Sequence, residues 1–382
     1  MTFKARNGEA DRQQSPGRRY IKDELDAAND GGLAASAGSP RRHIQLGNTP
    51  SIDPVAALRS AQPAPTPHKS TNTPAQEALA RHARDADYQI GKLLARGAEA
   101  VLYRTVKSSN TFCVKAIRNW LARAIGDTAT GDHEGKLNTP YRSKVRHLQN
   151  EFQVGLGLQE AGDIPVVRIY ALRKARRLGM QIGHDLLMEY IDGIDLSSKQ
   201  EVRAFTLAQK IDLFYQTAKA LQYMHRKSFI HLDMKPSNIM VANGRVKLID
   251  FGVSVSLGHK PRAVTGTAGF MSPEQIARDY LDQGTDIFAL GVTFAVIFGN
   301  PSLRQDPADL RSKAFRANAA YLLGNDEAPI LPAVPELREV PAIENLIRRC
   351  TIPCRTKRLR DAAGLAQQIR HAADAAGIPI ER

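Results

Sequence analysis

Hydrophobic and polar positions follow different patterns on either side of residue 190. Between residues 88 and 190, short alternating or continuous apolar runs predict β-strands at 89–94, 101–105, 111–116, 166–172 and 184–190. Beyond residue 190, apolar residues recur at every third or fourth position, which predicts helices with one buried face. The clearest such helix spans 207–227 and carries Leu207, Ile211, Phe214, Ala218 and Leu221 on that face. Strands followed by helices predict an α+β protein with two lobes.

Four further segments complete this outline. A helical pattern occupies 143–159, a strand-like run occupies 246–249, and the polar stretch 126–141 is expected to be an inserted loop. The longest apolar run, 288–298, is interrupted by a glycine and is shorter than the roughly 18–20 residues that a bilayer span needs. We therefore predict a buried helix there and no membrane span. The N-terminus lacks the apolar segment of a secretory signal peptide.

Residues 1–85 have a different composition from the rest of the chain. Their apolar residues are mostly alanines, aromatic residues are nearly absent, and prolines recur, most densely in 62–67. Such a segment cannot bury enough surface to offset the entropy lost on ordering. We predict a disordered tail over 1–85, with at most a transient helix around 19–28, followed by a folded domain over 86–382.

Composition and charge exclude several classes of protein. Hydrophobic residues make up 42% and charged residues 24% of the chain, which is typical of a soluble protein with a packed core. The 3 cysteines are too few for a disulfide scaffold. Cys350 and Cys354 are spaced as one helical turn, but His371 lies too far along the chain to favour a zinc site with them.

The formal net charge of +14 favours anionic partners, although an Arg- and Ala-rich composition alone accounts for it. The basic clusters at 173–177 and 355–360 are short and contain no aromatic residues of the kind that stack on bases. A nucleic-acid partner is therefore not favoured.

The densest chemical signal is the segment H-L-D-M-K-P-S-N at 231–238, followed by D-F-G at 250–252. A carboxylate can orient an attacking hydroxyl, and an Asn with a second carboxylate can hold Mg²⁺ against a triphosphate. A nearby Lys can offset the charge that develops on the transferred phosphoryl group. This spacing therefore indicates phosphoryl transfer rather than a polar turn between two strands.

These motifs resemble those of the eukaryotic-type (Hanks) protein kinase family over about residues 88–370. The resemblance implies a kinase domain whose N-lobe, 86–190, is a small antiparallel sheet with one main helix and whose C-lobe, 191–382, is mostly helical. It implies that Asp233 is the catalytic base, that Lys235 faces the phosphates, and that Asn238 and Asp250 bind Mg²⁺ or Mn²⁺. Lys235 makes the chain similar to serine/threonine kinases, which use ATP, rather than to tyrosine kinases.

The resemblance also implies a nucleotide site. Lys115, in F-C-V-K at 112–115, matches the lysine that contacts the α- and β-phosphates, and Glu151 is its expected partner, with a surface glutamate as the alternative. The segment L-M-E-Y-I at 187–191 resembles the hinge, where Met188 is the gatekeeper and backbone groups of Glu189 and Ile191 bond adenine. Asp195 matches the acid that meets the ribose. The other expected nucleotide contacts are Leu94, Ala95, Gly97, Ala100, Leu102, Cys113 and Met240.

Three features depart from the family pattern. The phosphate-binding loop A-R-G-A-E-A at 95–100 keeps only the middle glycine, Gly97. Gly155, one helical turn after Glu151, stands where the family packs an apolar residue. Leu232 replaces the arginine that often precedes the catalytic Asp, so a phosphate on the activation segment would lack its main partner. We expect activity without phosphorylation of that segment.

Three scaffold features point to protein substrates. G-T-A-G-F-M-S-P-E at 266–274 resembles the end of an activation segment, here residues 250–274, and small-molecule kinases generally lack such an end. Asp286 resembles the buried acid that anchors the catalytic loop, and Arg358 resembles the arginine that pairs with Glu274. An active serine/threonine kinase acting on proteins is the main hypothesis. A pseudokinase scaffold, favoured by the depleted glycine loop, and a small-molecule kinase are the alternatives.

The same features leave the cellular setting open. We expect a cytoplasmic protein, and a secreted effector acting in a host cell is the alternative that the composition of the tail suggests. The sequence indicates neither the protein substrate nor the oligomeric state.

Overall fold

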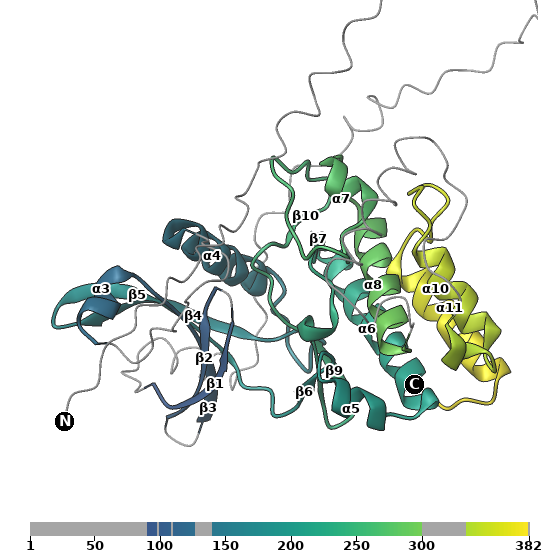
Figure 1. Cartoon of the computed structure of the whole chain (residues 1–382), viewed down its shortest axis with the longest axis horizontal. Coiled ribbons are helices and arrows are strands. Elements are labelled where there is room, and N and C mark those ends of the chain that lie inside the picture. Colours follow the sequence, from purple (N-terminus) through teal and green to yellow (C-terminus); the bar gives the residue numbers. More distant parts are fainter. Residues whose placement is uncertain (1–89, 98, 108–109, 127–139, 300–333, 381–382) are drawn as a thin grey trace, which may run out of the picture. The chain divides into compact units, whose positions relative to one another are not determined.

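The computed structural model describes residues 90–97, 99–107, 110–126, 140–299 and 334–380, which all belong to one compact unit. The predicted tail over 1–85 with its transient helix, and nearly all of the loop predicted at 126–141, lie outside the described residues. The described residues form a β-sheet lobe followed by a mostly helical lobe, which confirms the two-lobed fold predicted from the sequence (Figure 1).

The N-lobe is built on one antiparallel sheet of five strands in the order β1-β2-β3-β5-β4. Helix α4 (Tyr141–Gly157) packs against this sheet, and the short helix α3 (Trp120–Ala124) lies against β5 (Figure 1). The strands are β1 (Lys92–Arg96), β2 (Val101–Lys107), β3 (Asn110–Arg118), β4 (Ile169–Arg177) and β5 (Met180–Glu189).

Two predicted strands were misplaced along the chain. The strand predicted at 166–172 is β4 at 169–177, because residues 165–167 bond to the C-lobe instead: Val167 N–H donates to the carbonyl of Leu248, and Leu248 N–H donates to that of Pro165. The strand predicted at 89–94 is β1 at 92–96. The remaining predicted strands of this sheet agree with β2, β3 and β5 to within a few residues.

The C-lobe is organised around two buried helices, α6 (Leu207–Arg226) and α8 (Gln283–Ile297). A capping box between Thr206 and Gln209 begins α6, and Asp282 caps α8. Almost every residue of α8 is buried, as predicted for the run 288–298. The other described helices are α5 (Lys199–Ala204), α7 (Pro273–Ala277), α10 (Pro341–Cys350) and α11 (Ala362–Ala375).

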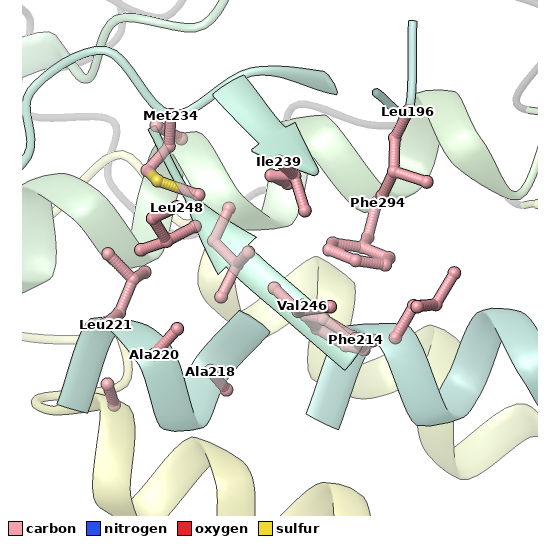
Figure 2. Packing of buried hydrophobic residues seen from close by; sticks show 14 of the residues in the cluster. Leu196, Phe214, Ala218, Ala220, Leu221, Met234, Ile239, Val246, Leu248 and Phe294 are labelled. Atoms are coloured by element: carbon pink, nitrogen blue, oxygen red, sulfur yellow. The ribbon is translucent and has the colours of Figure 1, made fainter. Parts of the chain in front are cut away.

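Two small sheets carry the loops of the candidate site. They are β6-β8-β9, made of Ile194–Asp195, Ile239–Ala242 and Arg245–Leu248, and β7-β10, made of Phe229–Ile230 and Val255–Ser256. Figure 2 shows Ile239, Val246 and Leu248 of the first sheet packed over α6. Beneath them Phe214 of α6 stacks on Phe294 of α8, with ring centroids 4.6 Å apart. The segments on either side of Asn238 therefore rest on a rigid apolar base.

No helix among the described residues is long and apolar enough to cross a membrane.

Candidate active site

The loop between β7 and β8, residues 231–238, is fixed from below by Asp286 of α8. The buried Asp286 carboxylate accepts hydrogen bonds from the backbone N–H groups of His231 (2.8 Å) and Leu232 (2.9 Å). Nε2 of His225 lies 2.9 Å from the same carboxylate. Leu232 has a φ of 65°, which is costly for a residue with a side chain. The two backbone bonds hold the loop in this conformation, in the role that the family resemblance implied for Asp286.

Asp233 is the centre of a hydrogen-bond network above this loop. Thr267 Oγ donates to Asp233 Oδ1 (2.6 Å), and Lys235 Nζ contacts both Asp233 Oδ2 (2.6 Å) and Thr267 Oγ (2.8 Å). The Asn238 amide donates to the Asp233 carbonyl (2.8 Å) and to Oδ2 (3.2 Å). The structure therefore brings together Asp233, Lys235 and Asn238 from the catalytic loop and adds Thr267 from the activation segment.

Lys115, Glu151 and Asp250 form a second charged cluster. Lys115 Nζ of β3 lies 2.8 Å from Glu151 Oε2 of α4 and 3.0 Å from Asp250 Oδ1. Glu151 is 1% exposed, so it is the buried partner expected for Lys115 and not a surface glutamate. The cluster joins β3, α4 and the loop after β9, which are distant in the sequence.

The pKa values of these three groups follow from burial and from their mutual attraction. Burial raises the pKa of Glu151 to about 7, although Lys115 acts against the shift. Desolvation also disfavours the charged form of Asp250, but Lys115 outweighs it and lowers the pKa of Asp250 to about 2. For Lys115, the two carboxylates outweigh desolvation and raise its pKa. Asp250 is thus an anion and Lys115 a cation at neutral pH.

Asn150 of α4 is a residue whose role the sequence did not reveal. Its amide donates hydrogen bonds to the carbonyls of Phe251 (3.1 Å), Gly252 (3.1 Å) and Ser254 (2.9 Å). Three such bonds fasten the backbone that follows Asp250 to the helix that carries Glu151. An amide directly before the glutamate of the helix was the available signal, but a helical Asn is usually a surface residue.

The phosphate-binding loop connects β1 and β2. Leu94 and Ala95 lie on β1 with exposed side chains, whereas Ala100 is buried. Gly97 N–H donates to the Ala100 carbonyl (2.9 Å) and so closes a tight turn. Glu99 reaches α4, where it pairs with a histidine that the sequence did not single out. Opposite the loop, Leu102 of β2 pairs in register with Lys115 of β3.

The hinge predicted at 187–191 begins in the last three residues of β5 and continues beyond the strand. Met188 is buried and pairs in register with Cys113 of β3, which is itself 9% exposed. Glu189 N–H donates to the carbonyl of Arg168 (2.8 Å), and the Glu189 carboxylate binds Lys247 (2.6 Å). The backbone N–H of Glu189 is thus used within the protein, and the adenine contacts of Glu189 and Ile191 that the resemblance implies stay a prediction.

Asp195 and Met240 face each other in the β6-β8 pair. The Oδ1 atom of Asp195 accepts hydrogen bonds from the backbone N–H of Ser197 (2.8 Å) and from the Ser197 hydroxyl. Asp195 thus shapes the turn after β6 as well as standing at the position expected to meet the ribose.

The activation segment is held at its far end by a buried ion pair. Arg358 contacts both carboxylate oxygens of Glu274, at 2.7 and 3.1 Å, and both side chains are fully buried. Next to Glu274, the Gln275 amide donates to the carbonyls of Leu232 (2.9 Å) and Thr265 (2.5 Å). Gln275 thereby ties the segment directly to the catalytic loop, a contact that the sequence did not suggest.

The cysteines lie away from this site, except for Cys113. Burial raises the pKa of Cys350 to about 12, and Cys350 packs in the core of the C-lobe. Within the described ranges, no group of three or more His, Cys, Asp or Glu side chains is arranged to hold a metal ion.

Comparisons with known proteins identify the family. A family model for the protein kinase domain matches residues 88–372. An Aurora kinase from Eremothecium gossypii is 27% identical over 292 residues, which cover 72% of this chain and 71% of that protein. Serine/threonine-protein kinase PknB from Mycobacterium tuberculosis is 28% identical over 234 residues, which cover 57% of this chain and 33% of PknB. The similarity to PknB thus extends over about a third of that protein.

Proposed function

The chain belongs to the protein kinase family, among the serine/threonine kinases, and we propose that it is an active enzyme that transfers the γ-phosphoryl group of ATP to hydroxyl groups of proteins. The observation that carries this proposal is the Lys115–Glu151 ion pair of 2.8 Å, with Asp250 on the same lysine. In kinases a lysine held in this way positions the α- and β-phosphates. The two carboxylates on Lys115 support a nucleotide-binding site, and Asp233 with Lys235 and Asn238 beside it supports transfer.

Asn238 and Asp250 are suited to hold the divalent cation, Mg²⁺ or Mn²⁺. Both offer hard oxygen ligands, and Asp250 is ionised because its pKa lies near 2. The Asn238 amide nitrogen is directed at Asp233, so its oxygen is the atom left for a metal. A cation bound here neutralises charge on the phosphates.

Asp233 is the group that orients the attacking hydroxyl and accepts its proton. Thr267 and Lys235 each contact one of its carboxylate oxygens, and the bond from Asn238 fixes the backbone. Lys235 sits 2.6 Å from Asp233 and so can offset charge on the transferred group at the point where the hydroxyl attacks. Thr267 belongs to the activation segment, which couples the placement of Asp233 to the surface expected to dock a protein substrate.

The pseudokinase alternative rests on the phosphate-binding loop. Ala95 and Ala100 stand where the family has glycines, and their methyl groups narrow the approach of the backbone to the phosphates. The alternative predicts nucleotide binding without transfer. A small-molecule kinase is disfavoured because the Glu274–Arg358 pair supports a complete segment of the kind that docks protein substrates.

The test is phosphoryl transfer from labelled ATP to a generic basic protein by the full chain. We expect Mg²⁺-dependent transfer by the native chain. Asp233→Ala and Asp250→Ala should each lose more than about a hundredfold in rate while still unfolding in one cooperative thermal transition. Glu201→Ala, which removes an exposed carboxylate on α5, is the matched control. ATP binding without transfer by the native chain would favour the pseudokinase, and wild-type activity of Asp250→Ala would remove Asp250 from the metal site.

A further inference from the structure

One end of the N-lobe, away from the active-site residues, is both strongly basic and apolar. We define the basic arm as residues 118–126, which include α3, and residues 169–184, which include the β4–β5 hairpin. Neither segment contains Asp or Glu. The basic residues of the arm are Arg118, Arg123, Arg173, Lys174, Arg176 and Arg177.

Among the described residues, the acid that directly follows the hairpin is already engaged in an ion pair. Asp185, the first acid after the hairpin, is buried in an ion pair with Arg118, with 2.5 Å between Oδ1 and Nη1. Lys174, Arg176 and Arg177 on β4 are all exposed. The exposed part of the arm therefore carries a local excess of positive charge, beyond the general excess of the chain.

Three large apolar side chains are exposed on the same arm. Leu178 is 85% exposed, Trp120 is 79% exposed and Met180 is 42% exposed. Single exposed apolar residues are ordinary, but a group of them next to basic residues marks an interaction site.

The fold holds Trp120 at the same end of the sheet as the hairpin turn. Asn119, directly before Trp120, donates from its side chain to the carbonyl of Gln181 (3.0 Å) and from its backbone to that of Ile182 (2.9 Å). Behind these bonds Ala122 of α3 packs against Ile182. Figure 1 shows α3 lying next to the end of β5.

The turn itself has an unusual residue. Arg177 pairs with Met180, so Leu178 and Gly179 form a two-residue hairpin turn, with φ values of 50° and 80°. Turns of this kind favour Asn, Asp or Gly at the first position, because leucine is disfavoured in the left-handed region. A leucine that is sterically disfavoured and also almost fully exposed contributes nothing to folding that asparagine would not provide. A leucine that is both exposed and in a strained backbone conformation is explained if Leu178 contacts a partner.

We propose that the basic arm binds the surface of an anionic lipid bilayer. Leu178, Met180 and Trp120 enter the boundary between headgroups and acyl chains, where tryptophan is favoured. Lys174, Arg176 and Arg177 face the lipid phosphates, and their aliphatic stems lie along the apolar boundary. A protruding turn with an apolar tip and basic flanks fits a bilayer better than it fits nucleic acid, because Leu178 and Met180 would find no apolar surface on a nucleic acid.

The chain provides its own probe for this proposal, because Trp120 is its single tryptophan. The full chain is titrated with vesicles of phosphatidylcholine, either alone or with about 30% phosphatidylserine, and tryptophan emission and co-sedimentation are recorded. We expect a blue shift and co-sedimentation with the anionic vesicles only, and a loss of both in high salt. The absence of a blue shift with anionic vesicles would overturn the proposal, even if the chain sediments, because the arm would then not be the contact.

Two variants and a control separate the arm from the rest of the basic chain. Leu178→Asn should lower the partition coefficient by roughly tenfold and leave the melting temperature unchanged or higher. Lys174→Gln with Arg176→Gln should lower the partition coefficient at least tenfold, because each charge near an anionic surface changes it by roughly fivefold. Lys219→Gln with Arg338→Gln removes two exposed charges elsewhere and should change it less than about twofold. Equal binding by all these proteins would overturn the proposal, as would an equal blue shift with single-stranded DNA or polyglutamate.

Discussion

Glu99 of the phosphate-binding loop and His147 of α4 form an ion pair, with 2.9 Å between Oε2 and Nδ1. His147 lies one helical turn before Glu151, so the pair ties the loop to the helix that holds the partner of Lys115. The shared hydrogen bond lowers the pKa of Glu99 and raises the pKa of His147, with burial acting against both shifts. Lys115 and Asp250 are the other charged groups that act on the pair. This contact gives the phosphate-binding loop an anchor on α4.

The pair predicts a pH-dependent contribution to stability. The stabilisation from His147 is fully present below the ordinary pKa of histidine and is lost as the pH rises through the raised pKa of His147. The stabilisation from Glu99 is fully present above the ordinary pKa of glutamate and is lost as the pH falls through the lowered pKa of Glu99. The contribution is therefore largest between these ordinary values, 4.5 and 6.5. Both side chains are about a third exposed, so we expect only about 0.5 kcal/mol.

Urea unfolding of the native chain and of His147→Asn between pH 4 and pH 9 measures this contribution. The difference in the free energy of unfolding should be largest between pH 4.5 and pH 6.5 and should be lost as the pH rises through the raised pKa of His147. His259→Asn, an exposed histidine of the activation segment, is the control and should show no such maximum. A difference between the native chain and His147→Asn that stays constant with pH would mean that the ion pair is not its source.

The contact between Gly155 and Ile169 explains why a glycine, and not an apolar residue, follows Glu151 by one helical turn. It also carries a second prediction. A Cβ atom on Gly155 would lie 2.2 Å from Cγ1 of Ile169, so the isoleucine of β4 fills the space that an apolar residue on α4 would use. Gly155→Leu should therefore destabilise the domain by about 1–3 kcal/mol and lower the transfer rate. Ile169→Ala should also destabilise it, because it leaves a cavity.

The double variant decides between this explanation and a general intolerance of the helix to substitution. Gly155→Leu combined with Ile169→Ala should be more stable than Gly155→Leu alone, because alanine removes the atom at 2.2 Å, Cγ1, and leaves only Cβ, at 2.9 Å. Urea unfolding of the four proteins gives the coupling free energy. Purely additive effects would show that the two residues do not share that space.

Gln275 carries the third prediction, which concerns the catalytic loop, where Leu232 replaces the usual arginine. Its amide bridges the carbonyls of Leu232 and Thr265, and the bridge passes so close to Gly266 that a Cβ there would lie 2.5 Å from the amide nitrogen. This is a link between catalytic loop and activation segment that needs no phosphate, which agrees with the expectation of activity without segment phosphorylation.

Gln275→Leu should lower kcat/KM for a protein substrate by roughly tenfold while leaving the KM for ATP nearly unchanged, because only the substrate-facing segment is released.

The native chain should show no lag in phosphoryl transfer after phosphatase treatment, once mass spectrometry has shown that Ser254, Ser256 and Thr265 carry no phosphate. A lag that preincubation with ATP removes, and that Thr265→Ala makes permanent, would contradict this prediction. An equal rise in the KM for ATP and in the KM for the protein substrate would mean that Gln275 acts on the fold as a whole.

The sequence predicts the elements of this fold far better than the contacts between them. Asp233, Asn238 and Asp250 are found from local spacing, because each lies on a short loop whose length sets its position. Asn150, Gln275 and the Glu99–His147 pair join segments distant in the chain, and no local pattern records them. The strand at 166–172 was misplaced for the same reason, since residues 165–167 pair with β9 of the other lobe.

The buried pair of Glu274 and Arg358 yields the final prediction, on stability. Neither side chain is exposed, and Arg358 also donates to the carbonyls of Gly284, Ile352 and Pro353. Arg358→Ala leaves the Glu274 carboxylate buried without its cation and should cost about 3–5 kcal/mol in urea unfolding. Glu274→Gln keeps the shape of the side chain and should cost less, because the arginine retains its carbonyl partners.

The pair also makes stability depend on pH. Attraction to Arg358 outweighs burial and lowers the pKa of Glu274. The stabilisation from Glu274 is therefore present above the ordinary glutamate pKa of 4.5 and is lost as the pH falls through the lowered pKa. If Arg358→Ala were to unfold at the urea concentration of the native chain at neutral pH, the pair would not be a structural support of the activation segment.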